Sequence, residues 1–156
     1  MREEFIMHMF DMEVKVQKQE ILFTNVSMKC INVLMVEDND INAQVIQAQL
    51  EQLGMKVTRA VDGKEAVELF RNSEVHTFDV ILMDILMPGM NGYEATRAIR
   101  RLHDHADALT IPIIAMTANV FVGDERTSFD AGMNGYMVKP IATEDVANTI
   151  VRNIHQ

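Results

Sequence analysis

Cysteine is almost absent from this chain, because Cys30 is the only one among its 156 residues. A single cysteine excludes an internal disulfide framework and a cysteine-based zinc site, and it is typical of proteins in a reducing compartment. The chain also lacks any apolar run close to the roughly 20 residues of a membrane span. Its acidic start, MREEF, does not predict a secretory signal. We therefore expect a cytoplasmic protein without a membrane segment.

Positive charge is also scarce, and it is not clustered. The chain has 14 Lys and Arg residues against 23 Asp and Glu residues, for a net charge of −9. This balance argues against direct binding of nucleic acid or of an anionic membrane. No glycine-rich phosphate loop of the GxxxxGKS/T or GxGxxG type occurs. His76, His103 and His105 have no ligand partners at fixed spacing, so we expect surface histidines rather than zinc ligands.

From Cys30 onward, five short apolar runs alternate with five stretches of helical apolar spacing. Apolar runs of this length are typical of strands buried on both faces of a parallel sheet. The alternation predicts an α/β fold with a five-stranded parallel sheet, helices on both faces and right-handed crossovers. The strands are expected at 31–36, 56–60, 80–83, 111–116 and 136–138, and the helices at 41–53, 63–70, 93–102, 123–131 and 143–153.

Residues 1–28 do not fit this alternation. Their apolar residues have a rough helical spacing that could equally begin a strand, and no turn residue divides them. We expect an N-terminal extension or linker at 1–28, followed by one domain at 29–156. The alternative is a helix that packs on the domain or on a second copy of the chain, which would make the protein a homodimer.

Reactive side chains stand where four of the five expected strands end. Glu37 and Asp38 follow the first strand, Asp84 the third, Thr117 the fourth and Lys139 the fifth. In open parallel sheets, ligands bind beyond the carboxyl ends of the strands. Three carboxylates brought together repel one another, and a hard divalent cation such as Mg²⁺ relieves this repulsion.

This set of groups predicts a phosphoryl-transfer site. A metal ion held by Asp38 and Asp84 can coordinate a phosphate oxygen, while Lys139 and the hydroxyl of Thr117 bind two others. Asp84 can then act as the nucleophile and become an acyl phosphate. No single residue is specific for a phosphoryl-transfer site, but the ordered set of residues at four strand ends is.

Four segments carry a resemblance to a known family: VLMVEDNDIN, DVILMDILMPGMNGYEATRAIR, PIIAMTAN and AGMNGYMVKPI. From about Cys30 to its end, the sequence resembles the receiver domain of two-component response regulators, and most of all receivers of hybrid sensor kinases. The resemblance implies a flavodoxin-like, CheY-like doubly wound sheet of strand order 2-1-3-4-5. It also implies a phosphorelay switch rather than an enzyme, which takes its phosphoryl group from a sensor histidine kinase or a phosphotransfer protein.

The resemblance further implies a role for each acidic residue. Asp84 would be the phosphoacceptor and a ligand of Mg²⁺ or Mn²⁺. Asp38 would bind the metal directly, Glu37 would act through a bound water, and the backbone carbonyl of Leu86 would complete the protein's share of the ligands. Glu37 stands where the family more often has Asp, which lengthens the side chain and keeps its charge.

The same resemblance implies a conformational switch. Lys139 and Thr117 would bind the acyl phosphate, and Tyr136 would be the aromatic switch residue, moving from exposed to buried as Thr117 moves toward the phosphate. The Lys139–Pro140 bond is often cis in this family. Whether the module acts through its surface, passes phosphate onward or belongs to a larger chain stays open.

Two other functions are compatible with an α/β sheet of this kind. One is an Asp-nucleophile phosphohydrolase, which usually has a DxD motif after the first strand and a cap domain. Here Glu37 and Asp38 are adjacent, and no insert is large enough for a cap. The other is a flavin-binding protein, against which the acidic strand ends and the missing phosphate-binding loop argue.

Overall fold

The structure is a computed structural model that describes residues 28–118 and 124–154. Its elements in chain order are the short 3-10 helix η1 (Met28–Cys30), β1 (Asn32–Val36), α2 (Asp40–Gln52), β2 (Lys56–Ala60), α3 (Gly63–Asn72), β3 (Val80–Asp84), α4 (Gly92–Arg100), β4 (Ile113–Thr117), α5 (Asp124–Ala131), β5 (Gly135–Val138) and α6 (Thr143–Ile154). Each of the five expected strands and five expected helices is present. The expected N-terminal extension lies outside the described residues except for Met28.

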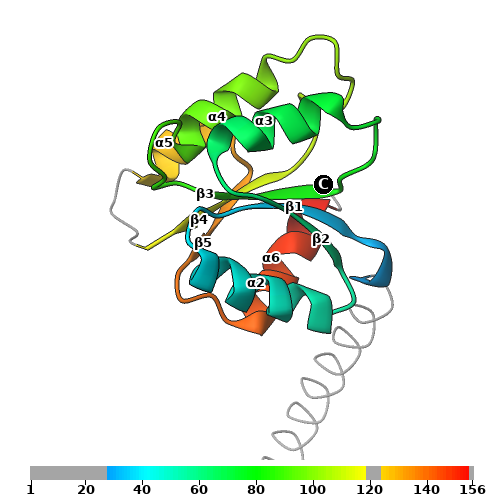
Figure 1. The fold of residues 1–156 in the computed structure, drawn as a ribbon, viewed down its shortest axis with the longest axis vertical. Coiled ribbons are helices and arrows are strands. Elements are labelled where there is room, and N and C mark those ends of the chain that lie inside the picture. The colour runs from blue at the N-terminus through cyan, green and yellow to red at the C-terminus, as the bar shows by residue number, and fades with distance from the viewer. Residues whose placement is uncertain (1–27, 119–123, 155–156) are drawn as a thin grey trace, which may run out of the picture.

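The five strands form one parallel sheet of order β2-β1-β3-β4-β5, which confirms the expected fold class. Figure 1 shows the sheet between two layers of helices, with α3 and α4 on one face and α2 and α6 on the other. The winding reverses between β1 and β3, the two strands at the centre of the acidic site. In such sheets, ligands bind beside the point of reversal.

The three central strands are buried along almost their whole length, as their apolar runs predict. β2 lies at one edge and alternates between exposed and covered residues, which is typical of a half-buried strand. β3 extends one residue beyond the predicted end, so that Asp84 is its last residue and is paired with Met116 of β4. The nucleophile expected from the sequence therefore stands on a rigid element.

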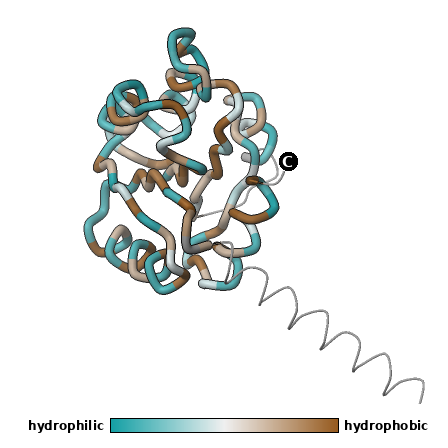
Figure 2. Tube along the Cα trace, turned by 90° about the vertical axis from the view of Figure 1, so that its right-hand side faces the viewer, coloured by the Kyte–Doolittle hydropathy of each residue, from teal (hydrophilic) through white to brown (hydrophobic). Residues whose placement is uncertain are grey.

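Two apolar clusters fill the space on either side of the sheet. One lies under α3 and α4, and the other lies under α2 and α6. Figure 2 shows apolar segments running through the interior and polar ones around it. Met28 is only 1% exposed and belongs to the second cluster, although the sequence analysis assigned it to the extension. Within the described ranges, no helix is long and apolar enough to cross a membrane.

Side-chain caps begin three of the helices just after strand ends. Asn39 caps α2, because its side chain accepts hydrogen bonds from the backbone N–H groups of Ile41 and Asn42. Asp62 caps α3, and Asn91 caps α4 in a reciprocal capping box with Glu94. These caps fix the loops that follow β1, β2 and β3; the first of these loops carries Glu37 and Asp38, and the third begins directly after Asp84.

The prediction that His105 lies at the surface is wrong. The residue is 8% exposed, and its ring lies against Phe70 with the ring centroids 4.3 Å apart. Its Nε2 lies 3.2 Å from the carbonyl oxygen of Ser73, while Nδ1 is buried with no hydrogen-bond partner among the described residues. The loop at 103–110 is polar in composition, but it folds against the end of α3 and carries this ring inward.

Candidate functional site

Three carboxylates converge at the carboxyl ends of β1 and β3. Glu37, Asp38 and Asp84 each offer one oxygen, and these oxygens all lie within 4.8 Å of one another. The pairing of β1 with β3 produces this arrangement, because Val36 lies beside Met83 and the acidic residues follow directly. Glu37 and Asp84 are buried, at 1% and 6% exposure, whereas Asp38 is exposed. The sequence predicted this convergence.

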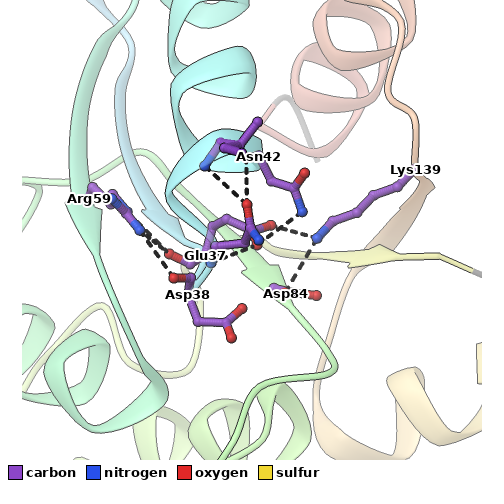
Figure 3. Close-up of polar contacts among 8 residues, drawn as sticks. Glu37, Asp38, Asn42, Arg59, Asp84 and Lys139 are labelled. Carbon is purple, nitrogen blue, oxygen red and sulfur yellow. Dashed lines mark hydrogen bonds and ion pairs between the residues drawn. The ribbon is translucent and has the colours of Figure 1, made fainter.

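Lys139 reaches the same group from beyond the end of β5 (Figure 3). Its Nζ lies 2.5 Å from Oε2 of Glu37 and 3.3 Å from Oδ2 of Asp84. The Lys139–Pro140 peptide bond is cis, as the family resemblance implied. The ammonium group therefore partly neutralises two buried acids, and its position beside Asp84 also suits an interaction with a phosphoryl group.

Glu37 is held at both of its carboxylate oxygens. Oε2 accepts from Lys139, and Oε1 accepts from the backbone N–H of Asn39 at 3.2 Å and from Nδ2 of Asn42 at 3.5 Å. This network fixes the direction of the longest acidic side chain in the group. Glu37 thus accepts three hydrogen bonds from protein groups, and its contact with a metal through a water stays a prediction.

Burial raises the pKa of Asp84 above its ordinary value of 3.8. The neighbouring charge of Glu37 raises this pKa further, whereas Lys139 and the backbone N–H of Leu86 lower it. Burial and the like charge have the larger combined effect, so ionised Asp84 is destabilised in the metal-free protein. A bound cation would remove this penalty.

The remaining expected site residues lie on β4 and β5. Thr117 is the last residue of β4, beside Val138 of β5, and its carbonyl oxygen accepts a 2.7 Å hydrogen bond from the backbone N–H of Lys139. Tyr136 is 38% exposed, and a hydrogen bond from its hydroxyl to the carboxylate of Glu125 raises its pKa. Thr117 thus lies at the same edge of the sheet as Asp84, while Tyr136 is exposed.

Two residues at the site were missed from the sequence. Arg59 of β2 donates hydrogen bonds to the backbone of the turn that carries Glu37 and Asp38. Gly92, the first residue of α4, lies so close to Asp84 that an added Cβ would be 2.3 Å from the Asp84 carbonyl oxygen. Arg59 lies outside the four segments that carry the family resemblance, whereas Gly92 belongs to one of them, but only the folded chain shows how close each residue lies to the acidic group.

The donor set fits a magnesium or manganese ion. It consists of carboxylate oxygens only, it includes one exposed group, and hard cations of this kind are held by one or two carboxylates while they keep several waters. A soft or nitrogen-preferring metal would need cysteine or histidine, and among the described residues no such side chain joins the cluster.

The fold and the acidic edge define a CheY-like α/β protein. The chain belongs to the response regulator receiver domain family, whose model matches residues 33–151. It is therefore a receiver domain of two-component signalling.

Its relatives include multidomain kinases. The chain is 34% identical over 126 residues to the sensor protein GacS of Pseudomonas syringae pv. syringae, covering 81% of this chain and 14% of that protein. It is 36% identical to hybrid signal transduction histidine kinase L of Dictyostelium discoideum, covering 76% of this chain and 7% of the kinase. The chain thus spans only a small part of these proteins and corresponds to their receiver segments.

Solved structures agree with this assignment. The receiver domain of a Pseudomonas aeruginosa PAO1 sensor histidine kinase, with a magnesium ion coordinated in its active site cleft, is 39% identical with a TM-score of 0.71, and the match covers 81% of this chain and 98% of that one. Vibrio cholerae chemotaxis protein CheY4 is 29% identical with a TM-score of 0.72, covering 80% and 98%.

Proposed function

We propose that Asp84 is the phosphoacceptor of a two-component phosphorelay and that its donor is a phosphohistidine on a sensor kinase or phosphotransfer protein. The observation that carries this proposal is the position of Asp84 at the end of β3, with Glu37 and Asp38 around it and Lys139 3.3 Å away. A carboxylate in this setting has a metal site and a cation on either side of the atom that would attack phosphorus.

In the proposed reaction, an oxygen of Asp84 attacks the phosphorus atom. The P–N bond of the phosphohistidine breaks, a P–O bond to Asp84 forms, and the leaving imidazole nitrogen recovers a proton. Asp38 and Asp84, with Glu37 through a water and the Leu86 carbonyl, would hold Mg²⁺, which neutralises charge on the phosphoryl oxygens. The domain is then a switch whose chemistry is confined to gaining and slowly losing one phosphoryl group.

Lys139 and Thr117 would bind the product. The Lys139 ammonium would exchange its contact with Glu37 for one with a phosphoryl oxygen, a movement that needs only side-chain rotation because Nζ already lies next to Asp84. The Thr117 hydroxyl would approach from the neighbouring strand. The acyl phosphate therefore has both a charged and a neutral donor available.

Movement of Thr117 would be coupled to Tyr136. In this structure Tyr136 is exposed and its hydroxyl donates to Glu125 of α5, so α5 and β5 are linked at the surface. We propose that phosphorylation shifts the population toward a state in which Tyr136 turns inward and this link is lost. The face around α5 and β5 would then differ between the two states.

Exposed apolar side chains near the site support a protein as the phosphoryl donor. Ile41 and Val45 lie one turn apart on α2, at 73% and 56% exposure, and Leu86 is 75% exposed two residues after Asp84. A small-molecule phosphoester needs no such surface, so these residues favour a phosphorelay over the phosphohydrolase alternative.

The proposed domain boundary follows from the core. Because Met28 is buried beneath α2 and α6, we propose that the folded receiver begins at or just before Met28 and that residues 1–27 are the extension. The sequence pattern predicts a domain that begins at residue 29, so the proposed boundary lies one residue earlier.

The test is phosphorylation of the whole chain with phosphoramidate or acetyl phosphate and Mg²⁺, followed by intact-mass measurement. Wild type should gain one phosphoryl group, and Asp84→Asn should gain none. Asp104→Asn, which changes an exposed aspartate in the loop before β4, should behave as wild type. Equal phosphorylation of Asp84→Asn would overturn the assignment, and repeated release of phosphate with many turnovers would favour the phosphohydrolase.

A further inference from the structure

Arg59 lies at the acidic site although it comes from β2, an edge strand of the sheet. Its Nε and Nη2 both donate to the carbonyl oxygen of Glu37, at 3.1 Å and 3.0 Å. Nη2 also lies 3.4 Å from the carbonyl oxygen of Asp38, and Nη1 forms an ion pair with Oδ1 of Asp40 at 2.8 Å. One guanidinium group thus contacts three of the four residues between β1 and the body of α2.

The strand geometry directs Arg59 to this turn. Residues two apart on a strand share a face, and Val57 packs in the cluster beneath α2, so Arg59 also projects toward α2. Arg59 is in register with Met35, and the backbone N–H of Glu37 donates to the carbonyl of Ala60 just beyond the strand ends. Both main chain and side chain therefore attach the acidic turn to β2.

Figure 3 shows Arg59 and Lys139 approaching the acidic group from opposite sides. Lys139 meets the carboxylates of Glu37 and Asp84, whereas Arg59 meets the main chain that carries Glu37 and Asp38. The two cations therefore have different effects. Lys139 balances charge at the reacting atoms, while Arg59 fixes the backbone from which two of the three carboxylates extend.

We infer that Arg59 is a positioning residue of the metal site. Its planar fork holds the Glu37–Asp38 turn so that both carboxylates converge with Asp84, a task for which a lysine is a poor substitute because it offers a point charge instead of a fork. Groups that orient metal ligands without touching the metal commonly affect metal affinity strongly. This inference rests on the proposed metal site and adds a residue to it.

If Arg59 acted on the metal site only through its charge, its removal would have the opposite effect on Mg²⁺ binding. A cation beside a metal site repels Mg²⁺, so its removal should strengthen metal binding. If positioning dominates, removal of Arg59 weakens Mg²⁺ binding, and the two explanations differ in the sign of the effect.

The experiment is calorimetric titration of the whole chain with Mg²⁺ alone. We expect Arg59→Lys and Arg59→Met to raise the Kd by roughly tenfold, because each removes the fork. Asp40→Asn removes the ion pair and keeps the fork, so its Kd should stay within about twofold of wild type. Two exposed positions serve as controls and should keep the wild-type Kd. Lys56→Met on the same strand controls for the lost charge, and Arg71→Lys on α3 controls for the exchange of arginine for lysine.

A second readout separates positioning from a general loss of structure. Amide spectra of metal-free Arg59→Lys should show shifts concentrated at residues 37–40, with an unfolding midpoint close to that of wild type. Wild-type affinity in Arg59→Lys, or tighter binding in Arg59→Met, would overturn the inference. Asp38→Asn tests the underlying site: if Asp38→Asn binds Mg²⁺ as well as wild type does, the proposed metal site itself fails, whereas its loss of binding with an unaffected Arg59→Lys overturns only the role of Arg59.

Discussion

Lys139 Nζ lies 2.5 Å from a carboxylate oxygen of Glu37, although 102 positions separate the two residues in the chain. The same ammonium group lies 3.3 Å from Asp84, so one cation pairs with two buried acids. Mg²⁺ and Lys139 would therefore act on the same negative charges. Metal binding should weaken the hold of the carboxylates on the lysine and release it for a phosphoryl oxygen.

Replacement of Lys139 should have opposite effects on Mg²⁺ binding and on the stability of the protein without metal. Lys139→Met should bind Mg²⁺ several-fold more tightly, because a positive charge beside the ligands is lost. Without metal, the variant should lose roughly 3 kcal/mol of unfolding free energy, since Glu37 remains buried without its cation. Urea unfolding with EDTA and with Mg²⁺ measures both effects. Lys64→Met, an exposed change on α3, should alter neither, and unchanged Mg²⁺ affinity in Lys139→Met would contradict the competition.

The raised pKa of Asp84 predicts how stability depends on pH in metal-free buffer. A carboxyl whose pKa is higher in the folded protein stabilises the fold below its unfolded pKa, near 3.8, and this contribution is lost as pH rises through the folded pKa. Asp84→Asn cannot ionise, so it should be more stable than wild type at neutral pH. The difference should shrink toward acid pH. Urea unfolding in EDTA across this range measures it, and a wild type that stays more stable at neutral pH would contradict the sign.

The close approach of Gly92 to Asp84 predicts that position 92 does not tolerate a side chain. A Cβ on Gly92 would lie 2.3 Å from the Asp84 carbonyl oxygen and 2.9 Å from the Cα of Ile85, both backbone atoms that cannot move aside easily. Gly92→Ala should therefore cost about 1–3 kcal/mol of unfolding free energy and slow phosphorylation. Gly89→Asn is the matched control, because that position has open space and asparagine tolerates its φ of +75°. Equal stability of the two variants in urea would contradict this prediction.

Arg100 joins three segments at the end of the sheet opposite to the site. Its guanidinium donates to the carbonyls of Gly132 and Ala108 and to the side-chain oxygen of Asn134, and burial lowers its pKa to about 10. Arg100→Met leaves two carbonyl oxygens without this donor and should cost about 2 kcal/mol or more. The neighbouring exposed change, Arg101→Met, should stay within about 0.5 kcal/mol of wild type. Thermal unfolding compares the pair, and similar midpoints would contradict a structural role for Arg100.

The layout of the fold was predictable because short apolar runs and turn residues divide this chain clearly. The bounds of β2 were predicted without error, since Gly54, with a φ of 87°, ends α2 before the strand and Asp62 caps α3 after it. The acidic convergence was predictable for a general reason: in a parallel sheet, all carboxyl ends lie at one edge, so polar residues at several strand ends must meet.

Other features depend on tertiary packing and could not be predicted from the sequence pattern. Nothing in the sequence distinguishes Arg59 from an ordinary polar residue of an edge strand, and its partners are backbone carbonyls that any sequence would supply. His105 lies in a polar loop, and its contacts with Phe70 and Ser73 form only in the folded chain. The pairing of Lys139 with Glu37 rather than with Asp84 alone also depends on side-chain directions that strand order does not determine.

The distance along the chain between Glu37 and Lys139 has a consequence for biosynthesis. A nascent polypeptide that has left the ribosome only as far as β4 exposes all three acids, but Lys139, which follows β5 and supplies their counter-charge, has not yet emerged. Domains generally fold as units once enough of the chain has emerged. The acidic group therefore gains its counter-charge only after β5 has emerged, so we expect the site to form late in the synthesis of this domain.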